Sequence, residues 1–174
     1  MLILVTGGSA SGKSEYAEHL AFSLSEGKKY YIATMFPYDE ESKHRIIRHR
    51  AMREDKNFET IECFYRLKNL KLPEKKVLLL ECVSNLTANE IYMPEGSKKN
   101  IADEIVSGIK NLNDQGLHTI VVTNEVFSSG LYYDENTIKY LEILGTINKE
   151  IAVMADRVVE VVYSIPVEIK GGTR

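Results

Sequence analysis

Short apolar runs alternate with longer amphipathic stretches along most of this chain. Continuous apolar runs bounded by polar or glycine-rich residues are typical of strands buried on both faces of a parallel sheet. Apolar residues that recur every three or four positions, such as Tyr16, Leu20 and Leu24, predict helices between those strands. The predicted strands cover residues 2–6, 30–34, 58–63, 77–82, 119–123, 158–163 and 167–170, and the predicted helices cover 12–26, 39–53, 83–92, 98–115 and 136–155.

This order of elements favours a three-layer α/β fold with a mostly parallel sheet. The last two strands are close in sequence and have Pro166 between them, which predicts a C-terminal antiparallel hairpin. Residues 65–72 are expected to form a linking turn or a short helix. No repeat, low-complexity tract or linker interrupts the pattern, so residues 1–174 are expected to form one domain.

Composition and charge restrict the function classes. A formal net charge of −3 argues against a general nucleic-acid-binding protein, because affinity for a polyanion comes mainly from clustered Lys and Arg. No apolar run approaches the length of about 18 residues that a membrane span needs, and no basic leader precedes the first strand. Cys63 and Cys82 lie in apolar runs without C-x-x-C spacing and are expected to be core thiols. These features favour a cytoplasmic protein.

The strongest motif follows the first strand directly. Residues 7–14 match G-x-x-x-x-G-K-[ST], with the preceding strand and following helix that the pattern requires. Glycines let successive N–H groups point at an anion, and the helix N-terminus adds its positive dipole. Lys13 is expected to reach the outer phosphates and Ser14 to bind Mg²⁺. The loop therefore predicts an NTP site formed by Gly7, Gly8, Ser9, Ala10, Ser11, Gly12, Lys13 and Ser14.

Polar residues end several predicted strands, at the sheet edge where open α/β folds bind ligands. Glu81 follows the apolar residues 77–80, and burying a carboxylate there without a partner would be costly. Pairing with Mg²⁺ or Lys13 removes that cost, and a structural salt bridge is the alternative. The pair Asn124 and Glu125 has the same position after the next strand, with function and structure equally open.

Residues 43–53 form an unusually basic segment. On a helix, Arg45, His49 and Arg53 share one face, and like charges at this spacing would be stabilised by a bound anion. An imidazole among guanidiniums disfavours its protonated form, which leaves it able to attack phosphorus. His49 is therefore the candidate nucleophile, ahead of His19, His44 and His118. The alternative is a solvated basic face without chemistry.

Taken together, the motifs resemble one family, the bifunctional adenosylcobinamide kinase/adenosylcobinamide-phosphate guanylyltransferases. The resemblance rests on the phosphate loop, Tyr31-Ile32-Ala33-Thr34, Arg45-Ile46-x-x-His49-Arg50-x-x-Arg53, Thr60-x-Glu62, Leu79-Leu80-Glu81-Cys82 with Asn89, Thr123-Asn124-Glu125-Val126, Gly145-x-x-Asn148 and Ala155-Asp156. It covers nearly the whole chain in order.

The resemblance implies a RecA-like phosphate-loop fold, a homotrimer and two reactions of cobalamin biosynthesis. The first transfers a phosphoryl group from ATP or GTP to adenosylcobinamide. The second transfers GMP from GTP to adenosylcobinamide phosphate through a GMP-histidine intermediate, with Mg²⁺ assisting both reactions. Position by position, the guanylylated histidine corresponds to His49, and Lys13 acts beside it. Besides residues 7–14, the implied nucleotide contacts are Thr34, Met35, Phe36, Arg50, Ala51, Met52, Arg53, Glu62 and Glu81; the implied metal ligands are Ser14 and Glu81.

Some positions depart from the family pattern. Ala10 stands where the family commonly has arginine, residues 127–133 replace Gly-x-Gly-Ile-Val-Pro, and apolar Ile138 and Leu141 mark the helix where further arginines are expected. The altered region is expected to shape the acceptor end of the site. Three alternatives therefore stay open: a guanylyltransferase without kinase activity, a small-molecule kinase that uses only the phosphate loop, and a GTP-binding regulatory module without turnover.

Overall fold

A computed structural model describes residues 1–51, 56–128, 130 and 132–172; within the helix at residues 40–51, the side chains of Arg45 and His49 are not described. The strands are β1 (Leu2–Thr6), β2 (Lys29–Ala33), β3 (Phe58–Glu62), β4 (Val77–Glu81), β5 (His118–Val122), β6 (Arg157–Val162) and β7 (Ile165–Lys170). The helices are α1 (Lys13–Leu24), α2 (Glu40–Ala51), the short 3₁₀ helix η1 (Leu67–Asn69), α3 (Val83–Tyr92), α4 (Ile101–Gln115) and α5 (Glu135–Met154).

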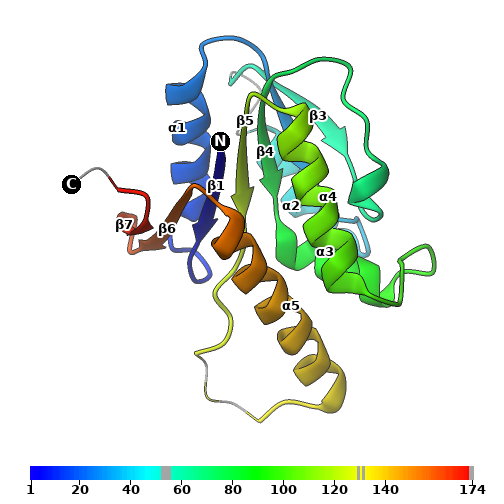
Figure 1. Cartoon of the computed structure of the whole chain (residues 1–174). Coiled ribbons are helices and arrows are strands. Elements are labelled where there is room, and N and C mark those ends of the chain that lie inside the picture. Colours follow the sequence, from blue (N-terminus) through cyan, green and yellow to red (C-terminus); the bar gives the residue numbers. More distant parts are fainter. Residues whose placement is uncertain (52–55, 129, 131, 173–174) are drawn as a thin grey trace.

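The strands form one sheet in the order β3-β2-β4-β5-β1-β6-β7 (Figure 1). Every neighbouring pair is parallel except β6 and β7, which form the expected antiparallel hairpin. Helix α1 packs on one face of the sheet, and α3, α4 and α5 pack toward the other. The predicted three-layer α/β architecture is therefore confirmed.

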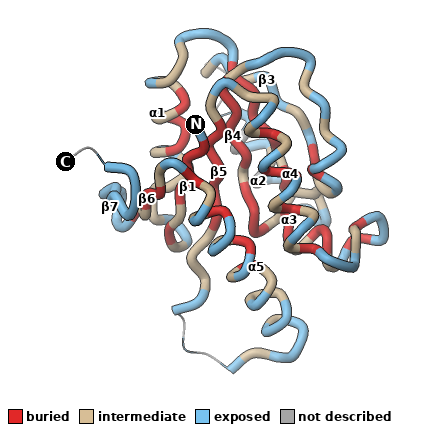
Figure 2. Tube along the Cα trace, viewed as in Figure 1, coloured by how far each residue is buried: buried red, intermediate tan, exposed pale blue. Residues whose placement is uncertain are grey.

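The central strands are buried on both faces, as their continuous apolar sequences predict (Figure 2). Alternate residues of each strand contribute to two separate cores. Leu78 and Leu80 face α3 and α4, whereas Val77 and Leu79 face α1. Among the described residues, no helix is long and apolar enough to span a membrane. Cys63 and Cys82 are both buried free thiols, as expected from their apolar surroundings.

The C-terminal hairpin differs from its prediction in one respect. Pro166 is expected in the turn, but it lies within β7, opposite Val161. Proline is tolerated there because β7 is the edge strand and can leave an N–H position unpaired. The turn is instead formed by Tyr163 and Ser164, whose φ angles of 50° and 62° are left-handed. Turn residues of this conformation match the twist of a tight hairpin.

Thr34 joins the ends of β2 and β4, immediately beside Glu81. Its hydroxyl donates to the carbonyl of Cys82 (2.8 Å) and accepts from the N–H of the same residue (2.7 Å). Its own N–H donates to the carbonyl of Glu81 (3.1 Å), and its carbonyl accepts from the side chain of Asn89 (2.8 Å). Thr34 is fully buried, so these bonds fix the chain on both sides of Glu81 without competition from water.

Replacing Thr34 with valine tests this role. Thr34→Val keeps the shape of the side chain but leaves the N–H of Cys82 without its acceptor, and an orphaned buried donor costs about 1–3 kcal/mol. We expect the free energy of unfolding in urea to fall by that amount. The control is Thr87→Val, because the buried Thr87 hydroxyl donates to the Val83 carbonyl of its own helix. Equal losses in both variants would contradict a special role for Thr34.

Candidate functional site

Residues 7–14 form a tight loop between β1 and α1. Gly7 and Gly12 have φ angles of 155° and 90°, which side-chain-bearing residues rarely adopt. The Lys13 ammonium group donates to the carbonyl of Gly8 (3.2 Å), so the lysine lies along the inside of the loop. The Ser11 hydroxyl oxygen is buried and has no hydrogen-bond partner among the described residues. A loop with these features at a helix N-terminus is suited to binding phosphate.

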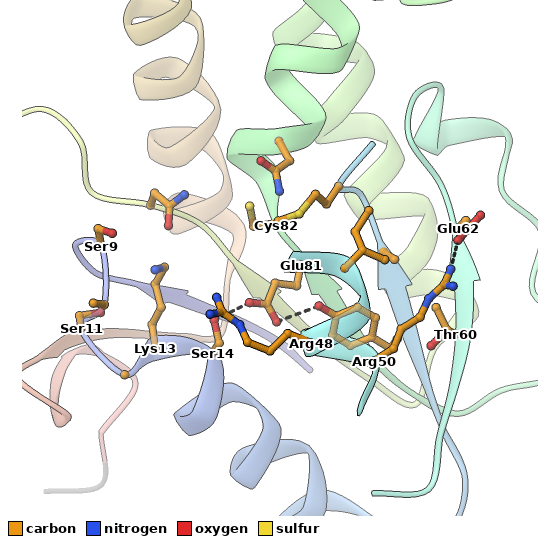
Figure 3. Close-up of a pocket in the computed structure, with 18 of the residues that line it drawn as sticks. Ser9, Ser11, Lys13, Ser14, Arg48, Arg50, Thr60, Glu62, Glu81 and Cys82 are labelled. Atoms are coloured by element: carbon orange, nitrogen blue, oxygen red, sulfur yellow. Dashed lines mark hydrogen bonds and ion pairs between the residues drawn. The ribbon is translucent and has the colours of Figure 1, made fainter. Parts of the chain in front are cut away.

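A cavity of about 560 Å³ opens beside this loop, at the carboxyl ends of the strands (Figure 3). Its walls come from the loop, from β2, β3 and β4, from the residues after β4 and β5, and from α2. The size is within the range of small-molecule sites. It is lined by Ser9, Ala10, Ser11, Gly12, Lys13, Ser14, Tyr31, Ala33, Met35, Ile46, Arg48, Arg50, Thr60, Glu62, Glu81, Cys82, Asn85, Asn124 and Val126.

Glu81 lies on the floor of the cavity, at the end of β4. The hydroxyl of Ser14 donates to one of its carboxylate oxygens, and the hydroxyl of Tyr31 donates to the other (3.2 Å; Figure 3). The two predicted metal ligands, Ser14 and Glu81, are therefore in direct contact. A hydroxyl and a carboxylate beside a phosphate loop are the oxygen ligands that suit Mg²⁺. The residues present fit this ion.

Helix α2 supplies two arginines to the opposite wall. Arg48 extends across the cavity toward Ser14 and Glu81, and Arg50 forms an ion pair with Glu62 at the end of β3 (Figure 3). Ile46, one turn before Arg50, also lines the cavity. His49 lies between the two arginines in the helix, and its side chain is outside the described part of the structure. Its predicted role as nucleophile stays a prediction.

The other predicted contacts differ in position. Met35 lines the cavity, whereas Thr34 is fully buried and its hydroxyl is occupied by Cys82. The ring of Phe36 packs edge-on against Phe64, with centroids 5.2 Å apart. Three further members of the set, Gly7, Gly8 and Ala51, are not among the lining residues, and Met52 and Arg53 are outside the described residues. Nucleotide contact by each of these residues stays a prediction.

Asn124 and Glu125 have separate environments. Asn124 lines the cavity, and its amide donates to the hydroxyl of Ser84 (2.5 Å). The Glu125 carboxylate instead accepts from the N–H of Phe127 (2.9 Å) and the hydroxyl of Ser128 (3.0 Å), which stabilises the loop that follows. Asn124 thus borders the cavity, whereas the Glu125 carboxylate bonds within its own loop, and a function for either residue stays a prediction.

Some residues that line the cavity were not among the site residues predicted from the sequence. Tyr31 belongs to an apolar strand, and nothing in the pattern marks its hydroxyl as a partner of Glu81. Arg48 belongs to the basic segment 43–53, but it is not on the helix face that Arg45, His49 and Arg53 are predicted to share. Cys82 borders the cavity, although burial raises the pKa of its thiol and disfavours the reactive thiolate. Tyr31 and Thr60 belong to the motifs of the family resemblance, and parallel strand register places them opposite each other on β2 and β3.

Comparisons with known proteins identify the family. Residues 3–169 match the family model "Cobinamide kinase / cobinamide phosphate guanyltransferase". The chain is 34% identical to the bifunctional adenosylcobalamin biosynthesis protein CobU of Escherichia coli (strain K12), over 98% of this chain and 100% of the relative. It is 32% identical, over the same shares, to the protein of that name from Salmonella typhimurium.

Solved structures support the fold alone. The flagellar accessory protein FlaH from Methanocaldococcus jannaschii superimposes with a TM-score of 0.50 at 16% identity, over 99% of this chain and 80% of that chain. A solved ATPase domain also has a TM-score of 0.50, at 10% identity, over 91% and 68%. The phosphate loop, the Ser14–Glu81 contact and the match along nearly the whole sequence agree: this chain belongs to the cobinamide kinase/cobinamide phosphate guanyltransferase family of cobalamin biosynthesis.

Proposed function

We propose that this protein phosphorylates adenosylcobinamide with ATP or GTP and then transfers GMP from GTP to adenosylcobinamide phosphate, with His49 as the covalent carrier. One observation supports the second reaction most strongly. Arg48 and Arg50 flank His49 on α2, and both line the cavity that the phosphate loop borders. We infer that His49, on the same helix, reaches a triphosphate held by the loop. We further infer that the protein acts in the cytoplasm, where both nucleotides are available.

In the proposed guanylyl transfer, an imidazole nitrogen of His49 attacks the α-phosphorus of GTP. The bond between the α-phosphorus and its bridging oxygen breaks, and pyrophosphate leaves with the bonding electrons. Lys13, Arg48 and the N–H groups of the phosphate loop stabilise the negative charge that develops on it. An oxygen of adenosylcobinamide phosphate then attacks the same phosphorus and displaces the imidazole. The product is adenosylcobinamide-GDP, and His49 returns to its starting state.

Mg²⁺ would be held by Ser14 and Glu81 in this proposal. Their direct contact supplies a hydroxyl and a carboxylate beside the loop, and Tyr31 orients the carboxylate through its second oxygen. When bound, the ion neutralises phosphate charge and so favours departure of pyrophosphate. The described residues contain no cluster of three or more His, Cys, Asp or Glu side chains suited to a separate metal centre.

A second candidate function is guanylyl transfer without the kinase step. It is favoured by Asn124 and Val126, which line the cavity just before the altered residues 127–133 in the sequence and contribute no charge. Ala10 likewise adds no cation to the loop. Transfer of label from γ-labelled ATP to adenosylcobinamide distinguishes the two functions, because only the bifunctional enzyme forms labelled adenosylcobinamide phosphate.

The nucleophile is tested by trapping the intermediate. Incubation with α-labelled GTP and Mg²⁺ should leave label on the protein that is stable in alkali and labile in acid, as expected for a phosphoramidate. His49→Ala should abolish this label, and His44→Ala should retain it because His44 lies on the same helix without bordering the cavity. Label that persists in His49→Ala would exclude this residue as the carrier. Loss in both variants would indicate damage to the helix instead.

The metal site is tested without turnover. Mn²⁺ substitutes for Mg²⁺ at oxygen sites, and its binding can be followed by electron paramagnetic resonance in the presence of GTP. Glu81→Gln removes a charged ligand, and we expect Mn²⁺ affinity to fall by about tenfold or more. Glu62→Gln is the matched control, because Glu62 borders the same cavity but pairs with Arg50. Equal losses in the two variants would argue against Glu81 as a metal ligand.

We also propose that the protein is a homotrimer, in which a second copy covers β7. Every residue of β7 is exposed, including Ile165 at 65% and Ile169 at 60%, and proteins commonly cover apolar edge strands. Light scattering on the purified protein should give three times the chain mass of 19.7 kDa. Ile165→Glu should shift it toward the monomer, whereas Leu117→Glu, at an exposed apolar position just before the central strand β5, should not. A wild-type monomer would refute the proposal.

A further inference from the structure

The turn of the C-terminal hairpin lies against the outer side of the phosphate loop. Tyr163 and Ser164 form the turn, and the N–H of Ser164 donates to the carbonyl of Ser11 (2.8 Å). This bond joins residues that are far apart in the sequence. Neither turn residue is among the residues that line the cavity. The hairpin is therefore in contact with the loop without occupying the place of a phosphate.

Two glycines of the loop leave room for the hairpin. A Cβ atom on Gly7 would lie 2.5 Å from the carbonyl oxygen of Val161 on β6. A Cβ atom on Gly12 would lie 2.7 Å from the hydroxyl oxygen of Ser164 and 3.2 Å from its Cα. By contrast, a Cβ atom on Gly8 would meet nothing within 4 Å. Gly7 and Gly12 thus cannot carry a side chain for two reasons: the hairpin lies too close to them, and their φ angles are unfavourable for other residues.

The hairpin is also attached to the helix that follows the loop. Arg157 on β6 donates to the hydroxyl of Tyr16 on α1 (3.2 Å) and to both carboxylate oxygens of Glu168 on β7 (2.7 and 2.8 Å). The carboxylate of Glu168 raises the pKa of Arg157, and the guanidinium lowers the pKa of Glu168. The pair stays ionised, and it links β7, β6 and α1. The hairpin therefore bonds to the second half of the loop through Ser11 and to the first turn of α1 through Tyr16.

We propose that Ser164 is a positioning residue for the nucleotide site. It holds the second half of the phosphate loop, so that the loop N–H groups converge on the phosphates before nucleotide binds. Binding then loses less conformational entropy, which increases affinity without any contact between Ser164 and the nucleotide. The inference rests on the nucleotide site proposed above.

A double-mutant cycle tests the proposal. Gly12→Ala places a methyl group against Ser164 and should weaken affinity for a fluorescent GTP analogue by about tenfold or more. Removing the opposing side chain in Gly12→Ala/Ser164→Gly should then recover affinity by about threefold or more, because contacting residues couple by this order of magnitude. The control is Gly12→Ala/Tyr163→Gly. Tyr163 occupies the adjacent turn position with a similar φ, but its side chain is 90% exposed, so no recovery is expected.

Hydrogen–deuterium exchange gives a second test that does not depend on the Gly12 variant. Ser164→Gly keeps the N–H bond to the Ser11 carbonyl but removes the side chain that packs against Gly12. It should therefore speed exchange of the loop amides at residues 7–14 relative to wild type, and Tyr163→Gly should not. Absence of recovery in the cycle together with equal exchange in the two glycine variants would overturn the role of Ser164. Failure of the wild-type protein to bind the GTP analogue at all would instead refute the nucleotide site itself.

Discussion

The contact between Ser14 and Glu81 joins the two halves of the nucleotide site. Glu81 ends a strand whose four preceding residues are buried, so its carboxylate needs partners that offset the loss of water. Ser14 and Tyr31 provide them through one hydroxyl each. Thr34 fixes the main chain directly around this carboxylate. The position of a candidate metal ligand is thus determined by hydrogen bonds from β2 and α1.

The candidate nucleophile has a different structural context. Helix α2 lines the cavity through Ile46, Arg48 and Arg50, and its ion pair with Glu62 joins side chains that are each about half exposed. Exposed ion pairs contribute little to stability, typically below about 1 kcal/mol. Arg50 can therefore exchange Glu62 for a phosphate at small cost. The phosphate loop and the basic helix thus border one cavity, which is the site that we propose for the triphosphate.

The C-terminal hairpin connects the sheet edge to the same site. Its apolar side chains are exposed, whereas its turn and its arginine contact the phosphate loop and α1. In addition to the trimer contact proposed for β7, the hairpin thus has contacts that restrict the backbone of the loop, where convergent N–H groups are most valuable for binding an anion.

The parallel sheet, the phosphate loop and the place of Glu81 at the end of an apolar run were visible in the sequence, because periodicity and turn chemistry act over a few residues. Other features depended on the tertiary structure. Tyr31 and Glu81 are 50 positions apart, and only the pairing of β2 with β4 brings hydroxyl and carboxylate together. Asn124 and Glu125 are neighbours in sequence, yet only Asn124 lines the cavity. The sequence by itself determined which residues form strands, helices and the phosphate loop; the fold decided which side chains meet, because those contacts depend on strand order and register across the whole sheet.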